Sequence, residues 1–177
     1  MADDGKVVLE LQGVDRPTLA HIWQKMRQGI ELKGQEAFIG RSMADHPDWF
    51  PIFETMDVLG GEDELPDGSN PFMHLTFHII IGSQIFNQNP PEAQTFYRMR
   101  LRKKDHPHDI IHMMLNVFQR HLAWAAQNPG PDGRPQFDQQ AYADTLKALW
   151  GLKSQKLWER LGFDGPPDRS GMGTPEY

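Results

Sequence analysis

The segment SNPFMHLTFHIII, residues 69–81, gives the clearest indication of the fold class. It is among the most apolar stretches of the chain, and Pro71 suits the first turn of a helix. We therefore predict a helix over residues 71–87. Two histidines, His74 and His78, lie four residues apart within it, and an imidazole buried without a partner costs free energy. The pair is either structural or half of a metal site.

Apolar residues at helical spacing predict further helices on both sides of this segment. On the N-terminal side, one helix begins after Asp15, a candidate N-cap, and a second follows an interruption at Gly34 and ends near Asp45. The stretch HPDWFPIFE, residues 46–54, adds one or two short helical turns. On the C-terminal side, helices are predicted over residues 91–104, 107–127 and 138–161. The expected N-cap of the first of these is Asn89.

The ends and loops of the chain carry different signals. The opening KVVLELQG alternates apolar and polar residues like a strand, but no second strand candidate lies nearby. We interpret residues 1–14 as an extended arm that docks on the body or on a second subunit. Residues 57–69 form an acidic loop, and residues 164–177 are predicted to be a disordered tail. The prediction is an all-α protein: a compact helical bundle of about five to six helices forming a single domain over residues 15–163.

Composition limits the classes of function. The chain has 177 residues and a net charge of −6, which argues against a generic nucleic-acid-binding protein because phosphate binding needs a basic surface. It has no cysteine, so disulfides, thiolate metal sites and thiol catalysis are excluded. It has no apolar run of the roughly 18 residues that a membrane helix needs and no signal-peptide pattern, so we expect no membrane association and a cytoplasmic location.

A second histidine pair, His108 and His112, lies in the stretch DHPHDIIHMM, within the predicted helix 107–127. Residues four apart lie on one face of a helix, which is the spacing at which two imidazoles reach one ion. Eight histidines in 177 positions predict roughly 0.35 such pairs by chance, so two pairs are unusual.

The order of the helices predicts that both pairs lie at the same end of the bundle. Each pair occupies the first two turns of its helix, after Pro71 and Pro107 respectively. One helix with short loops separates helices 71–87 and 107–127, so these two should run parallel. The positive end of a helix dipole disfavours imidazolium, which keeps histidine neutral and able to bind a metal.

We therefore predict a divalent transition-metal site. Its ligands would be His74, His78, His108 and His112, with additional ligands or supporting contacts from His46, Asp105, His106 and Asp109. A nitrogen-rich site without sulfur suits Zn, Fe, Ni or Cu, and we favour Zn or Fe. A di-iron carboxylate centre is disfavoured because residues 71–87 contain no Asp or Glu. A position left to water would permit hydrolytic or redox chemistry, whereas four protein ligands would make the site structural.

A structural interpretation stays open beside this one. Histidines near helix N-termini also cap backbone groups or bond to carbonyls in a polar layer. The protein would then be a non-enzymatic interaction module whose arm or basic segment, YRMRLRKK at residues 97–104, recruits a protein partner or a second copy of the chain. For that basic segment we favour the other explanation, a solvated helix face next to the acidic loop.

Four blocks of the sequence resemble the bacterial domain-of-unknown-function 1841 family. NPFMHLTFH resembles its N-P-F-L-H-M-x-x-H signature, and HPDWFPIFE resembles its H-P-E-Y-H-x-x-L-E segment. HDIIHMML is similar to its H-E-A-E-H-x-M-M-E block, and PQFDQQAYADTLKAL is similar to its P-D-E-x-x-Y-L-x-x-L end. The blocks come in the same order and cover roughly residues 15–150.

The resemblance implies a compact helical protein in which five histidines cluster, without implying a reaction. These are His46, His74, His78, His108 and His112. Two positions depart from the family pattern: Phe50 stands where the family has a second histidine, and Asp109 stands where it has a glutamate. The N-terminal arm and the residues beyond about 151 lie outside the resemblance.

Overall fold

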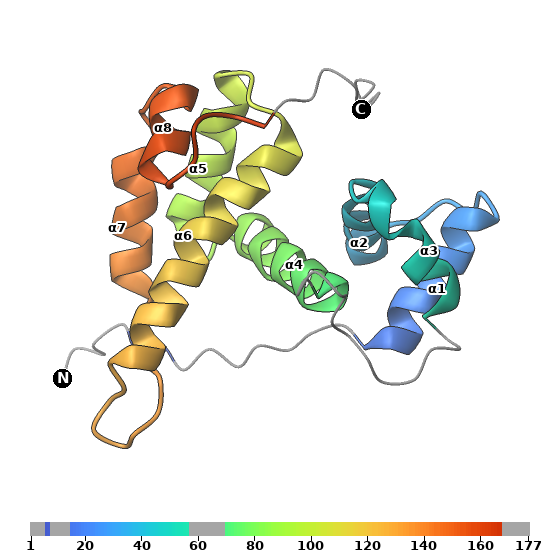
Figure 1. Cartoon of the computed structure of the whole chain (residues 1–177), viewed down its shortest axis with the longest axis horizontal. Helices are drawn as coiled ribbons and strands as arrows, with labels where there is room; N and C mark the ends of the chain where they lie inside the picture. Colours follow the sequence, from blue (N-terminus) through green and yellow to red (C-terminus); the bar gives the residue numbers. More distant parts are fainter. Residues whose placement is uncertain (1–5, 8–14, 57–69, 168–177) are drawn as a thin grey trace. The chain divides into compact units, whose positions relative to one another are not determined.

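The computed structural model of the chain describes residues 6–7, 15–56 and 70–167 (Figure 1). Helices account for nearly all the regular structure in these ranges, so the predicted all-α class is confirmed. The described residues form eight α-helices rather than the expected five to six. Among the described helices, none combines the length and the hydropathy of a membrane-spanning segment. The predicted acidic loop and most of the predicted arm and tail lie outside the described residues.

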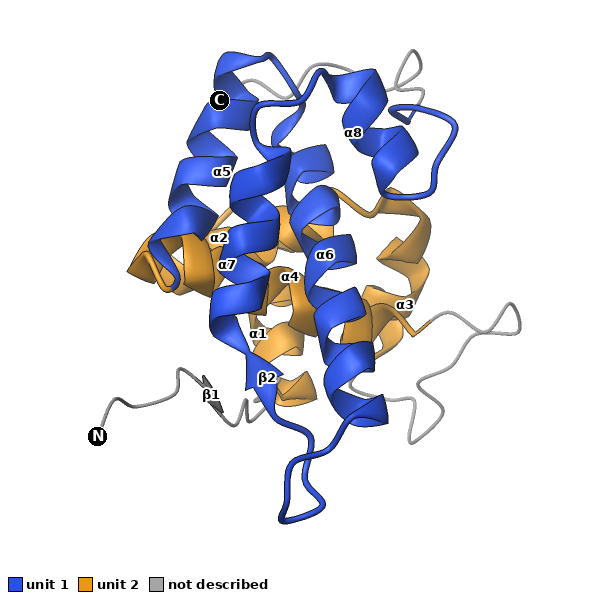
Figure 2. Cartoon of the chain, turned by 90° about the vertical axis from the view of Figure 1, so that its left-hand side faces the viewer, with its two compact units in different colours: residues 1–7, 90–177 blue, residues 8–89 orange. Residues whose placement is uncertain are grey.

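Contacts divide the chain into two compact units: unit 1, residues 1–7 and 90–177, and unit 2, residues 8–89 (Figure 2). The elements of unit 2 are α1 (Arg16–Arg27), α2 (Gly34–Ala44), the 3-10 helix η1 (Pro47–Trp49), α3 (Phe50–Thr55) and α4 (Pro71–Asn87). Helix α2 packs against α1 and α4, and α1 also packs against α3. The predicted helix over 71–87 and the short turns in HPDWFPIFE are therefore confirmed.

Local sequence signals explain where the helices of unit 2 begin. The Asp15 carboxylate accepts a hydrogen bond from the Thr18 amide at 2.9 Å, as expected for an N-cap, and hydrogen bonds from Thr18 lower the pKa of Asp15. The Asn70 side chain caps α4 by accepting from the Met73 amide at 2.9 Å. Gly34, expected as an interruption, is the first residue of α2, and its φ of 56° favours glycine there.

Apolar side chains at helical spacing form the core of unit 2. The Trp23 ring lies 5.3 Å from the Phe53 ring, measured between centroids, which joins α1 to α3. The buried core consists of Leu19, Ala20, Ile22, Trp23, Ile39, Met43, Phe53, Met56, Leu75 and Ile79. This core fixes α4, with its two histidines, against α2.

Replacing Asn70 by alanine is expected to lower the free energy of unfolding by about 1 kcal/mol, because the Met73 amide loses its acceptor. Urea denaturation followed by circular dichroism measures this loss. Asn70→Asp keeps an acceptor oxygen in place and should retain most of the stability. Equal stability of Asn70→Ala and the wild type would show that the cap contributes nothing.

Unit 1 contains four helices and a two-stranded pairing. Its elements are β1 (Lys6–Val7), α5 (Pro91–Arg102), α6 (Pro107–Gln127), β2 (Phe137–Asp138), α7 (Gln139–Leu149) and α8 (Ser154–Arg160). Helix α5 packs against α6 and α7, and α6 packs against α7. The rings of Phe118, Phe137 and Tyr142 contact one another at centroid distances of 5.0, 5.6 and 5.6 Å. The N-cap of α5 is Pro90 rather than Asn89, one residue later than expected.

The first strand of the chain has a partner. Lys6 lies opposite Asp138 and Val7 opposite Phe137, in antiparallel register. The expectation that no strand would be available for pairing was wrong. Strand β2 is only two residues long, too short to show an alternating pattern, and it directly precedes α7.

The last predicted helix, over 138–161, is in fact two helices, α7 and α8. Between them, the Leu152 carbonyl accepts a hydrogen bond from Nη1 of the fully buried Arg100 at 2.5 Å. Nη2 of Arg100 donates to the Ser154 hydroxyl at 2.9 Å and lies 2.6 Å from the Asp105 carboxylate, to which Ser154 also donates. A continuous helix would use the Leu152 carbonyl in its own backbone ladder. The break follows from this long-range contact, which helical periodicity does not report.

The basic segment 97–104 therefore has two roles in the fold. Arg98, Arg102, Lys103 and Lys104 are exposed, as a solvated helix face requires. Arg100 points the other way and is fully buried in the ion pair with Asp105. Asp105, considered above as a metal ligand, is thus engaged in a structural ion pair.

Candidate metal centre

Unit 2 brings three histidines together. His46 follows the C-cap of α2 and precedes η1, while His74 and His78 lie one turn apart on α4. His78 is buried, with 1% of its surface exposed, and the other two are half-buried. Helix α4 places its pair on one face, as the spacing predicted, and the turn after α2 supplies the third imidazole.

A backbone carbonyl fixes the tautomer of His46. Nδ1 of His46 lies 2.6 Å from the carbonyl oxygen of Ser42, at the end of α2. A carbonyl can only accept, so Nδ1 carries a proton, and in the neutral ring Nε2 is then the atom with the lone pair. This is the arrangement that histidine ligands to metals commonly have, with one nitrogen donating to a carbonyl and the other free to coordinate.

The Nε2 atoms of the three histidines converge. Nε2 of His74 lies 3.0 Å from Nε2 of His46 and 2.9 Å from Nε2 of His78. An imidazole nitrogen has one position in the ring plane for either a proton or a lone pair, so His74 Nε2 cannot make two full hydrogen bonds. Hydrogen bonding between Nε2 atoms can therefore account for only one of these two contacts.

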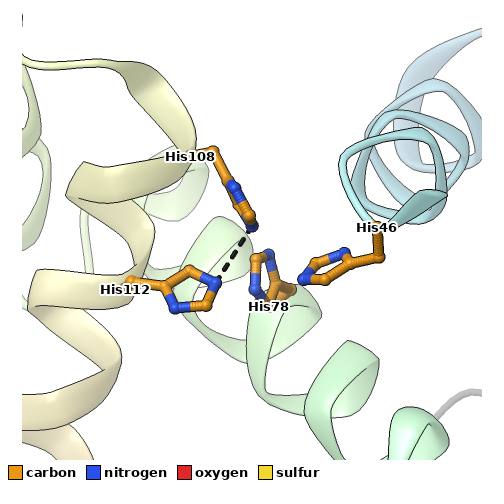
Figure 3. A group of neighbouring side chains, drawn as sticks. All are labelled: His46, His78, His108 and His112. Atoms are coloured by element: carbon orange, nitrogen blue, oxygen red, sulfur yellow. Dashed lines mark hydrogen bonds between the residues drawn. The ribbon is translucent and has the colours of Figure 1, made fainter. Parts of the chain in front are cut away.

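Unit 1 supplies a second converging pair. His108 and His112 lie one turn apart on α6, with Nε2 atoms 3.0 Å apart and ring centroids 4.4 Å apart (Figure 3). His108 is 8% exposed and His112 is half-buried. His106 has a different role: its Nδ1 accepts from the His108 amide at 3.3 Å and caps α6.

The five histidines that the family resemblance singles out thus form two sets, His46, His74 and His78 in unit 2 and His108 and His112 in unit 1. We call these five side chains the histidine cluster. Asp109, the neighbour of His108 on α6, is buried, with 7% of its surface exposed.

Trp49 is a site residue that sequence reasoning missed. Its ring stacks on His46, with centroids 4.6 Å apart and planes inclined by 4°, and its centroid lies 5.0 Å from that of His74. The contact restricts the rotation of the His46 ring and shields one of its faces from water. The sequence did contain a signal for this contact: His46 and Trp49 are three residues apart in HPDW, and a short helical turn brings residues at that spacing together.

One histidine outside the cluster behaves as a structural residue. Nε2 of His121 lies 3.0 Å from the Thr145 hydroxyl, and its ring packs against Phe137 and Tyr142. Burial lowers the pKa of His121, against a smaller opposing effect of Asp138. A hydroxyl partner and aromatic neighbours are what a polar structural histidine needs. In the histidine cluster, by contrast, Nε2 atoms of neighbouring imidazoles lie against one another.

Comparison with known families bears directly on these residues. A family model described as a domain of unknown function (DUF1841) matches residues 12–148, a range that includes all five members of the histidine cluster. Comparisons with curated proteins and with solved structures give no significant match. Since the family model matches well over half of the 177 residues, the chain belongs to the DUF1841 family.

Proposed function

We propose that the protein binds a divalent transition-metal ion through its histidine cluster. The observation that carries this proposal is the convergence of Nε2 atoms on His74, which lies 3.0 and 2.9 Å from His46 and His78. The 3.0 Å contact between His108 and His112 repeats the arrangement on α6. Nitrogens with lone pairs at such separations repel one another unless a proton or a cation lies between them.

The electrostatics of the helices support neutral, ligating imidazoles. Both histidine pairs lie in the first two turns of their helices, α4 and α6, where the positive end of the helix dipole disfavours an added proton. The Ser42 carbonyl keeps the proton of His46 on Nδ1. A cation therefore replaces protons that this environment disfavours.

The donor set limits the metal. Imidazole nitrogen without thiolate suits Zn²⁺, Fe²⁺, Ni²⁺ or Cu²⁺ and does not suit Mg²⁺ or Ca²⁺, which take oxygen ligands. When bound, such an ion would supply a Lewis acid, or a redox centre in the case of iron or copper. The protein would contribute the orientation of the rings, through the Ser42 carbonyl and the Trp49 stack.

Metal analysis of the full chain, purified without an affinity tag, tests the proposal. We expect about one ion per chain by mass spectrometry of the acid-digested protein, after reconstitution with Zn²⁺ or Fe²⁺ and removal of the excess. The double variant His46→Ala/His112→Ala removes one half-buried histidine from each unit. It should lose the ion and keep the helical circular dichroism spectrum of the wild type.

His21→Ala is the matched control, because His21 is exposed on α1 and does not belong to the histidine cluster. This variant should retain the metal content of the wild type. A wild-type protein that holds no metal after reconstitution, with unchanged melting, would refute metal binding. The histidines would then be the structural polar layer of an interaction module.

A further inference from the structure

A groove lies between the first half of α2 and the second half of α4, both in unit 2. Its volume is about 360 Å³. Ile79, Gly82 and Phe86 line it from α4, at spacings of three and four residues that place them on one helix face, and Phe38 lines it from α2. Among the described residues that line the groove, none belongs to the histidine cluster. The groove is therefore a separate feature of unit 2.

A glycine lets the two helices approach closely at this groove. A Cβ atom at position 82 would lie 2.1 Å from Cζ of Phe38, so any other residue there would displace the Phe38 ring. Gly82 is buried and Phe38 is half-buried. The Phe38 ring is thus packed against the backbone of α4, which gives the groove a fixed wall.

The second aromatic ring of the groove is open to solvent. Phe86 has 85% of its surface exposed. A ligand that covered this ring would remove apolar surface from water, which favours binding. Aromatic rings also prefer offset-stacked or edge-to-face contacts with one another. With Phe38 and Phe86 in its lining, the groove favours an aromatic ligand over an aliphatic one of the same area.

The charge of the groove indicates the charge of its ligand. Helix α4 contains no Asp, Glu, Lys or Arg, and the polar side chains that we find in the lining are the neutral Gln35, Ser83 and Asn87. The Asn87 amide donates to the Ser83 hydroxyl at 3.0 Å. A charged ligand would lose water here without gaining a counter-charge, so the groove is complementary to an uncharged molecule.

The size of the groove distinguishes a small molecule from a second copy of the chain. Eight of the described residues line it, whereas a stable protein interface uses about 20–30 residues on each side. Its volume, about 360 Å³, lies within the range of roughly 300–1,000 Å³ that is typical of small-molecule sites. The groove is therefore large enough for a small ligand and too small to hold a dimer together.

We propose that the groove between α2 and α4 binds an uncharged aromatic small molecule. The ligand would lie against Phe38 and Phe86, over the glycine backbone of α4, and a neutral polar group on it would bond to the amide or hydroxyl groups of the rim. This site goes beyond the proposed metal binding and does not depend on it.

Two dyes with the same ring system test the proposal on the full chain. N-phenyl-1-naphthylamine is uncharged and fluoresces more strongly in apolar surroundings, and 1-anilinonaphthalene-8-sulfonate is its sulfonated, anionic form. We expect the uncharged dye to give a saturable rise in fluorescence with one dye per chain. The anionic dye should bind at least about tenfold more weakly, because its sulfonate has no counter-charge in the groove. Equal affinities, or no saturable binding of the uncharged dye, would overturn the proposal.

Two variants locate the dye. Phe86→Ala removes one aromatic contact and should weaken binding of the uncharged dye about 2- to 10-fold, and Ser83→Trp should block the groove and weaken it further. Both side chains are exposed, so the helical circular dichroism spectrum should not change. Leu101→Ala is the control, since it removes an exposed apolar side chain from α5, in unit 1. Wild-type affinity in all three variants would show that the dye binds elsewhere.

Discussion

Asp105→Ala is expected to lower the free energy of unfolding by about 3–5 kcal/mol, the largest loss that we expect from a single substitution in unit 1. The side chain of Arg100 is fully buried, and that of Asp105 is 9% exposed. Removing the carboxylate leaves the guanidinium in the interior with only the Leu152 carbonyl and the Ser154 hydroxyl as partners. The expected loss is the free-energy cost of a buried charge without its counter-ion. This cost is larger than the stabilisation that an ion pair on the surface provides.

Urea denaturation monitored by circular dichroism measures this effect, with Arg98→Ala and Lys103→Ala as controls. Both control residues are exposed on the same basic segment, so their removal should change stability by no more than about 0.5 kcal/mol. The double variant Arg100→Met/Asp105→Leu removes both charges and should recover much of the loss. An Asp105→Ala loss no larger than that of the controls would show that the pair does not hold α5 to the turn before α8.

Removing the metal from the loaded protein is expected to lower the free energy of unfolding by about 4 kcal/mol, if the free ion was present at roughly a thousand times its dissociation constant. The ion binds the folded arrangement of imidazoles and has little affinity for the unfolded chain, so its binding free energy adds to stability. Thermal melting with Zn²⁺, then with excess chelator, gives the difference.

Protons compete with the ion for the same nitrogens, so this stabilisation should shrink as the pH falls. His46→Ala/His112→Ala should melt at the same temperature with and without chelator, and His21→Ala should respond like the wild type. If the melting temperature of the wild type is the same with Zn²⁺, with chelator and with neither, metal binding does not stabilise the fold.

Much of the helical framework could be predicted because its signals are local. Pro71 and Pro107 suit the first turns of α4 and α6, and the bounds of both helices agree with the sequence-based prediction. The failures have long-range causes. The break before Ser154 depends on Arg100, more than fifty residues earlier, and β2 exists because Lys6–Val7 pairs with it.

The two histidine pairs could be recognised without a structure, since residues four apart must lie on one face of any helix that contains them. The prolines at the helix starts also indicated that both pairs lie in about the first two turns. The position of His46 beside His74 could not be recognised in this way, because it depends on the turn after α2, the Ser42 carbonyl and the stacked ring of Trp49. Helical periodicity reports which side chains share a face, but the orientation of an imidazole is set by atoms that packing brings to it.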